Sequence, residues 1–231
     1  MKTKKIFVKG RYKKFSRDIP QNSPGNKHRT SVADIIVNAG KDLFSSERCL
    51  FHAAGREDKD TLMLGSGRPF ILEIINPTIT NINFEKITGM INLSGDIEVF
   101  KLSFCEKEEI KRIKNSKWNK TYQVRVVFKE EISKMRVIEA ISTLTGTIIS
   151  QRTPQRVNDS RPDLVRKKKI IFFKMKNFFK DQALFEIKAE SGTYIKELIS
   201  GDKQRTNPSL SSLLGIKCKV LELDVIGIED D

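Results

Sequence analysis

The sequence predicts an α+β protein with a mixed, mainly antiparallel sheet. Short segments in which apolar and polar residues alternate, typical of half-buried strands, recur along the 231 residues. Segments with the apolar spacing of helices lie among them, but the two kinds do not alternate strictly. Long loops separate many of these segments. This order disfavours a doubly wound parallel sheet, which needs a regular succession of strands and helices.

The first half of the chain begins with a basic, extended segment over residues 9–17, followed by turn-forming residues at 20–25. Thr30 or Ser31 caps a predicted helix in which apolar residues from Val32 to Leu43 keep helical spacing. A loop dense in charge and glycine is expected at 55–68. Strands are expected at 48–53, 69–76 and 96–104, and helices at 84–90 and 106–115.

In the second half, the clearest strand covers residues 122–128, where Tyr122, Val124, Val126 and Phe128 alternate with more polar neighbours. Further strands are expected at 146–151, 170–174, 183–190 and 217–228, and helices at 132–144, 194–200 and 210–214. Residues 152–169 form the least structured stretch and are crowded with Arg and Lys. A loop of this length within a compact domain tends to be functional or disordered.

The composition favours an intracellular protein that binds a polyanion. The formal net charge is +14 and the pI is about 9.7, a balance most often associated with nucleic acid, although a lysine-biased surface is the plain alternative. The apolar runs are too short to cross a bilayer or to form a signal peptide, so no membrane association is expected. Three widely spaced cysteines and only two histidines argue against a disulfide framework, a zinc site or His-based metal catalysis.

The densest candidate for chemistry is the loop around Asp58. Glycines in this loop permit close approach of another backbone, and flanking arginines favour the charged form of a carboxylate. Such a carboxylate suits a nucleophile or a base, and the plain alternative is a solvated charged turn. Glu57 and Asp60 are interpreted as loop charges, either of which could support Arg56 or Arg68. His52 is expected to be a hydrogen-bonded structural residue.

Several blocks, in this order, resemble one family. They are GRYKKFSR at 10–17, GRED at 55–58, MLGSGRPF at 63–70, QRTPQRV at 151–157, GTYIKE at 192–197 and NPSL at 207–210. Together they are similar to the archaeal and eukaryotic tRNA pseudouridine synthases that act on uridines 54 and 55 of the T-arm. The resemblance covers nearly the whole chain, from about Phe7 to the C-terminus.

The resemblance implies the pseudouridine synthase fold, a catalytic domain over residues 1–231 made of two merged α+β halves that divide near 105–120, with a cleft that holds the RNA. It implies that Asp58 is the essential aspartate and that Tyr122 stacks on the target base. Lys196 matches the basic residue that pairs with the aspartate, and Leu223 matches an apolar residue that closes the pocket. The expected reaction breaks the glycosidic bond of uridine and rejoins the base through carbon, so no cofactor and no metal are expected.

A base buried in the T-arm must leave its stack before it reacts. Arg56, beside Asp58, is placed to fill the vacated stack or to hold the backbone. The Arg-rich stretch 152–169 is interpreted as phosphate-binding, because guanidinium groups match phosphate oxygens; a localisation-type tract or a solvated face is the alternative. By pattern alone, Tyr122 is more often a core residue. The cations expected to contact the RNA backbone are Arg11, Lys13, Lys14, Arg17, Arg68, Arg152, Arg156, Arg161 and Arg166.

The chain departs from this family at two points. An N-terminal RNA-binding domain with paired Cys-x-x-Cys motifs has no counterpart in the sequence, so an auxiliary RNA-binding protein is a possible partner beside tRNA. Where the family continues with a His-Arg-Arg type stretch, residues 158–161 read NDSR. A catalytically silent tRNA or rRNA chaperone is the second interpretation and a basic scaffold protein the third. The expected location is the nucleus or the cytoplasm.

Overall fold

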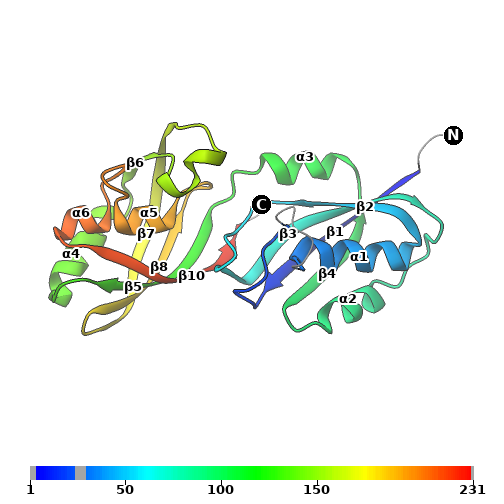
Figure 1. Ribbon diagram of the computed structural model, residues 1–231, viewed down its shortest axis with the longest axis horizontal. Helices are drawn as coiled ribbons and strands as arrows, with labels where there is room; N and C mark the ends of the chain where they lie inside the picture. Colours follow the sequence, from blue (N-terminus) through cyan, green and yellow to red (C-terminus); the bar gives the residue numbers. More distant parts are fainter. Residues whose placement is uncertain (1–3, 24–29, 230–231) are drawn as a thin grey trace. The chain divides into compact units, whose positions relative to one another are not determined.

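The structure, a computed structural model, describes residues 4–23 and 30–229. The chain folds as two compact units, Met1–Ser116 (unit 1) and Lys117–Asp231 (unit 2). Each unit combines strands with helices (Figure 1), and the strand pairings described within each unit are antiparallel. Among the described residues, no helix is long and apolar enough to cross a membrane. Residues 24 and 25 of the expected turn lie outside the described ranges.

Unit 1 is built around one antiparallel sheet with the strand order β4-β1-β3-β2. Its strands are β1 (Lys5–Lys14), β2 (Ser46–Ala53), β3 (Leu62–Pro77) and β4 (Ile97–Cys105), and its helices are α1 (Val32–Phe44), α2 (Phe84–Asn92) and α3 (Glu108–Asn115). Residues 67–74 of β3 are buried without interruption. A strand covered on both faces gives such a run, which explains why this stretch of β3 contains few polar residues.

Helix α1 begins at a capping box and packs closely on the sheet. The Ser31 hydroxyl accepts from the Asp34 amide at 3.1 Å, and the Asp34 carboxylate accepts from the Ser31 amide at 3.0 Å. Gly40 lies against the sheet so tightly that an added Cβ would come within 2.4 Å of the Leu72 side chain. Helix α2 contacts α1 and β4, whereas α3 contacts β2 and β3.

The neighbour of Leu72 on β3 points to the opposite face of the sheet, because strand side chains alternate. This neighbour, Glu73, accepts from Lys5 Nζ at 2.7 Å and lies 2.9 Å from His52 Nε2. The expected structural role of His52 is thus confirmed: its ring is hydrogen-bonded within the sheet.

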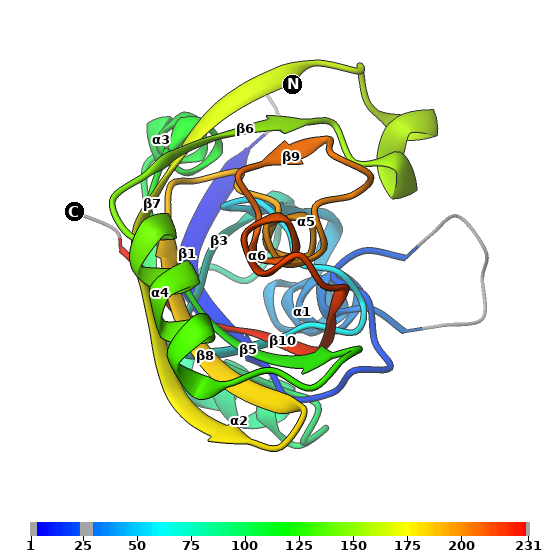
Figure 2. The same ribbon diagram turned by 90° about the vertical axis from the view of Figure 1, so that its left-hand side faces the viewer.

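Unit 2 has the strand order β10-β5-β8-β7-β6-β9. Its strands are β5 (Lys120–Phe128), β6 (Ile148–Arg152), β7 (Val165–Phe179), β8 (Gln182–Ala189), β9 (Thr206–Asn207) and β10 (Cys218–Ile228). Its helices are α4 (Lys134–Leu144), α5 (Ile195–Ser200) and α6 (Leu210–Leu214), with a 3₁₀ turn η1 at Gln155–Ser160. Helix α4 lies against β7 and α5 against β10, and α6 contacts both helices (Figure 2).

The sequence predicted most of these elements, but two of the predicted loops were longer than the observed ones. Strand β3 begins at Leu62, so residues 62–68 belong to the sheet rather than to the expected loop. Strand β7 begins at Val165 and pairs with β6, so residues 165–169 are also strand. In both places Gly, Lys and Arg mask the strand pattern, and pairing with another strand supplies the missing preference.

Candidate active site

The loop that carries Asp58 joins β2 to β3 in unit 1. It starts at Ala54, whose amide donates to Pro69 O at 3.0 Å, and continues through Gly55, which has a φ of +77° that favours glycine. A turn follows Asp58, because the Thr61 amide donates to Asp58 O at 3.1 Å. Asp58 itself is partly exposed. The turn thus leaves part of Asp58 exposed at the surface of unit 1.

Beneath this loop lies a buried polar network. The Glu57 carboxylate accepts from Arg68 Nε at 2.7 Å, and the Tyr12 hydroxyl lies 3.0 Å from each of its oxygens. The same hydroxyl accepts from Gln21 Nε2 at 2.8 Å. The Arg68 and Glu57 side chains are only 1% and 0% exposed. Burial, and then the negative charge of Glu57, raise the pKa of Tyr12 well above its ordinary value, so its hydroxyl remains a donor.

Side chains also hold the carbonyl groups of the loop, one after another. Arg68 Nη1 donates to Ala54 O at 2.7 Å, and Gln21 Nε2 donates to Gly55 O at 3.0 Å. Lys14 Nζ donates to Lys59 O at 2.7 Å and lies 3.5 Å from Asp58 O. Arg17 Nη1 donates to Asp60 O at 2.7 Å. The path of the main chain on both sides of Asp58 is therefore fixed by donors from β1, the segment after it and β3.

Three cations expected to contact RNA are buried in unit 1 and hold this loop region instead. Lys14 and Arg68 are 0% and 1% exposed, and burial lowers the pKa of Lys14. Arg11 donates to Ser66 O and to Gly67 O, the latter at 2.9 Å. The close packing requires glycine at position 67, because an added Cβ would come within 2.8 Å of Tyr12 O. The prediction for Arg11, Lys14 and Arg68 was wrong, because these residues are 9%, 0% and 1% exposed and bonded internally, which leaves little surface for a phosphate.

The other predicted cations of unit 1 are more accessible. Arg56 is exposed beside Asp58. Lys13 is partly exposed, pairs with Glu98 at 3.1 Å and lies 5.0 Å from the ring centroid of Phe100. Arg17 is partly exposed and holds the Asp60 carbonyl. Arg56 and Lys13 thus retain surface that a nucleic acid could meet.

In unit 2, the structure brings Tyr122 and Leu223 together on neighbouring strands. Tyr122 of β5 pairs with Val225 of β10, and Val124 pairs with Leu223. The four side chains therefore share one face of the sheet, with Tyr122 and Leu223 as diagonal neighbours. Tyr122 is 7% exposed and Leu223 is 9% exposed. This burial is what the alternation of β5 predicts.

Lys196 lies in the first turn of α5, in a helix that is held from the QRTPQRV block. The Gln151 side chain clamps the backbone of Tyr194, donating to its carbonyl and accepting from its amide, each at 2.9 Å. The next residue in the helix, Glu197, is buried and accepts from Arg156 Nε at 2.8 Å. The orientation of the helix that bears Lys196 thus depends on residues some forty positions earlier.

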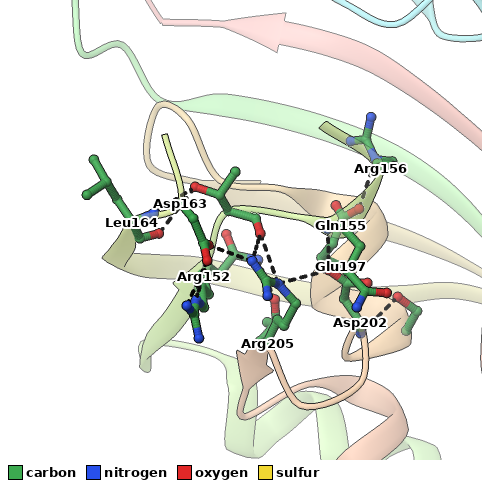
Figure 3. A network of polar contacts seen from close by, with 12 residues as sticks. Arg152, Gln155, Arg156, Asp163, Leu164, Glu197, Asp202 and Arg205 are labelled. Atoms are coloured by element: carbon green, nitrogen blue, oxygen red, sulfur yellow. Dashed lines mark hydrogen bonds and ion pairs between the residues drawn. The ribbon is translucent and has the colours of Figure 1, made fainter. Parts of the chain in front are cut away.

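The Arg-rich stretch is an ordered network rather than an open loop (Figure 3). Asp163 accepts from Arg152 Nη2 at 2.7 Å and from Arg205 Nη2 at 2.6 Å, and the hydrogen bond from Arg152 lowers its pKa. Arg161 Nη1 donates to the Tyr194 hydroxyl at 2.9 Å, and Arg166 Nη1 donates to Thr153 Oγ1 at 3.0 Å. The arginines expected to bind phosphate are therefore already ordered by internal partners.

The described residues contain no group of three or more His, Cys, Asp and Glu side chains that could hold a metal ion. Unit 1 offers a carboxylate on a fixed loop with an exposed arginine beside it. Unit 2 separately offers guanidinium groups that match phosphate.

Comparison with known proteins identifies the family of the chain. Residues 7–229 match the family model described as "Pus10, C-terminal". The chain belongs to this family. It is 42% identical over 228 residues to the tRNA pseudouridine synthase Pus10 of Pyrococcus furiosus, covering 98% of this chain and 58% of that protein. It is 38% identical to the enzyme of the same name from Thermofilum pendens, covering 97% and 53%. The chain thus spans little more than half the length of these relatives.

Solved structures share the fold of this Pus10-family chain. A chain of a Cbf5-Nop10-Gar1 complex matches with a TM-score of 0.54 and 13% identity, covering 95% of this chain and 58% of that one. A chain of the archaeal box H/ACA sRNP Nop10-Cbf5 complex matches with a TM-score of 0.51 and 13% identity, covering 95% and 47%. The expected α+β pseudouridine synthase fold is confirmed.

Sequence reasoning missed several residues that hold the candidate regions in each unit of this Pus10-family chain. Tyr12, Gln21 and Gln151 lie within or beside the quoted blocks, but their partners are main-chain groups and buried charges that leave no local signal. Asp163 and Arg205 come together from positions 42 residues apart. The pairing of Glu57 with Arg68 was one of the possibilities that the sequence left open, since either Glu57 or Asp60 could support Arg56 or Arg68.

Proposed function

We propose that this chain is the catalytic part of a tRNA pseudouridine synthase that converts uridine to pseudouridine in the T-arm, at position 54, position 55 or both. The observation that carries the proposal is Asp58 in its Gly-Arg-Glu-Asp motif, held on a loop whose carbonyls are bonded on both sides of it. Family membership and the names of the full-length relatives support it. Such an enzyme acts inside the cell, where tRNA is processed.

The proposed reaction is an isomerisation in which every atom of the substrate is kept. The N1–C1′ bond of uridine breaks, the uracil turns, and a C5–C1′ bond forms; C5 loses its proton and N1 gains one. Asp58 acts either as a nucleophile at C1′ or as a base that removes a sugar proton to give a glycal. Both routes need an ionised carboxylate that is held in one place, and neither needs an oxidant or a reductant.

The remaining residues supply binding in this proposal. Arg56 is exposed next to Asp58 and fills the place of the flipped base or holds the backbone. Tyr122 stacks on the uracil and Leu223, its diagonal neighbour, adds apolar contact. Lys196 is the basic residue that pairs with Asp58 in this proposal, as the family resemblance implies.

Backbone binding is assigned to the cations that retain surface. They are Lys13, Arg17, Arg152, Arg156, Arg161 and Arg166. Arg152 and Arg161 would exchange an internal carboxylate or hydroxyl partner for a phosphate oxygen as RNA binds. The tRNA is the proposed partner.

The test uses Asp58→Asn beside Asp60→Asn, which removes a carboxylate from the same turn. With a tRNA transcript as substrate, Asp58→Asn should abolish pseudouridine formation and leave tRNA affinity within about threefold, because the charge that reacts is lost while the RNA-binding cations remain. Asp60→Asn should keep most of the activity. Wild-type turnover by Asp58→Asn would overturn the assignment, and a wild type that binds tRNA without modifying it would favour an RNA chaperone.

A further inference from the structure

The buried network below the Asp58 loop has a role beyond stability. We propose that Tyr12, Gln21, Glu57 and Arg68, here called the loop-positioning network, set the direction of the Asp58 carboxylate and so determine turnover rather than RNA binding. This inference rests on the function proposed above, in which Asp58 is the reacting group. None of the four needs to touch the substrate; each acts through the loop main chain or through Glu57.

The chemistry of the network is hard to explain by stability alone. Tyr12 packs against apolar rings, with its centroid 6.1 Å from that of Phe51 and 6.3 Å from that of Phe70. Phenylalanine would fill this space equally well. A buried ion pair is weak support for a fold, because desolvation of both charges offsets much of their attraction. The polar groups are therefore better explained by what they orient.

What they orient is the short stretch around the reacting residue. The Glu57 side chain is anchored at both oxygens, and it directly precedes Asp58 in the chain. On the near side, Ala54 O and Gly55 O receive bonds from Arg68 and Gln21. On the far side, Asp58 O accepts from the Thr61 amide. Because peptide units are planar, bonds on both sides leave the Asp58 backbone little freedom to turn.

The Tyr12 hydroxyl is the junction of this network. It donates to Glu57 and accepts from Gln21, whose amide group also holds the Gly55 carbonyl. Tyr12→Phe removes only this oxygen. The substitution breaks two hydrogen bonds and leaves the Glu57–Arg68 ion pair intact, so it loosens the loop without leaving a buried charge unpaired.

Unit 1 offers a matched control in Glu73. Like Glu57 it is a buried carboxylate: the side-chain exposure is 9% for Glu73, which lies in β3, and 0% for Glu57. Glu73 is bonded to Lys5 and His52. Its described partners hold no carbonyl of the Asp58 loop. Glu73→Gln should therefore lower stability without changing the turnover of the folded protein.

The experiment measures kcat and KM for tRNA together with hydrogen exchange of the amides of residues 54–61. We expect Tyr12→Phe to lower kcat at least about tenfold, because small misplacements of a reacting group are costly, while KM stays within about twofold. Exchange of the loop amides should accelerate at least about tenfold. Gln21→Met, which keeps the volume but removes both donors, should act in the same direction, whereas Glu73→Gln should change neither readout.

Two results would overturn the proposal: loop exchange in Tyr12→Phe and Gln21→Met no faster than in Glu73→Gln, or a loss of activity that only follows the folded fraction. If the wild type forms no pseudouridine, the proposed function fails. The exchange comparison still tests whether the network holds the loop, so the two failures can be told apart.

Discussion

Replacing Glu57 by glutamine is expected to be among the most destabilising conservative changes in unit 1. Glutamine keeps the shape and can still accept from Tyr12, but Arg68, at 1% exposure, loses its counter-charge. Removing one partner of a buried pair costs about 3–5 kcal/mol, a large share of the stability of a typical domain. The pair between Lys13 and Glu98 is 25% and 38% exposed, so Glu98→Gln should cost about 0–1 kcal/mol.

A double variant separates the cost of the unpaired Arg68 charge from the effect of losing the hydrogen bond to the loop. Adding Arg68→Met to Glu57→Gln removes the stranded cation, so most of the lost stability should return, as it does when buried pairs are replaced by apolar groups. Turnover should stay low, because Ala54 O has lost the donor that Arg68 provided.

The assay is urea unfolding followed by circular dichroism, with hydrogen exchange of β1 and β3 amides to report on unit 1, because the two units need not unfold together. A loss below about 1 kcal/mol for Glu57→Gln, equal to that of Glu98→Gln, would refute the claim that burial makes this pair costly to break. A double variant no more stable than the single one would refute it as well.

Three further outcomes are expected. Asp163→Asn should raise tRNA affinity by up to about fivefold and steepen its salt dependence, because Arg152 is released for phosphate; weaker binding in a filter assay over a salt series would contradict this. Burial raises the pKa of Glu73, but hydrogen bonds from Lys5 and His52 outweigh it and hold that pKa below its ordinary value. The contribution of Glu73 to stability is therefore present above about pH 4.3 and is lost as the pH falls through the folded pKa. Glu73→Gln should make the free energy of unfolding less dependent on pH in the acid range. Equal pH dependence in the variant and the wild type would contradict this. Burial raises the pKa of Cys105 and Cys218 to about 11. Both thiols in the native protein should therefore react with iodoacetamide at pH 8 at least about tenfold more slowly than after unfolding. Equal rates in the two states, measured by mass spectrometry, would contradict this.

The sequence predicted the elements whose pattern is local. The alternation from Tyr122 to Phe128 and the helical spacing after Ser31 each repeat within a few residues, so β5 and α1 were placed close to their observed bounds. The start of β3 is set by pairing with β1, about fifty residues earlier, and the start of β7 by pairing with the preceding strand β6. No local pattern records that pairing, and both segments contain residues that disfavour strands.

The candidate site shows the same division. The motif around Asp58 could be singled out because its residues are contiguous, and its catalytic role stays a prediction. The surroundings of the neighbouring cations could not be predicted. Charge alone does not distinguish a lysine that meets a phosphate from one that, like Lys14, is buried against carbonyl groups. Arg68 was misassigned for the same reason, since its partner Glu57 was one of several acidic residues within reach.

The most direct test of the account is chemical mapping of pseudouridine in tRNA incubated with the purified chain, wild type beside Asp58→Asn. The account predicts pseudouridine at position 54, position 55 or both with the wild type, and none with the variant, although both bind the tRNA. Modification by the variant at the wild-type rate, or wild-type modification only outside the T-arm, would contradict it.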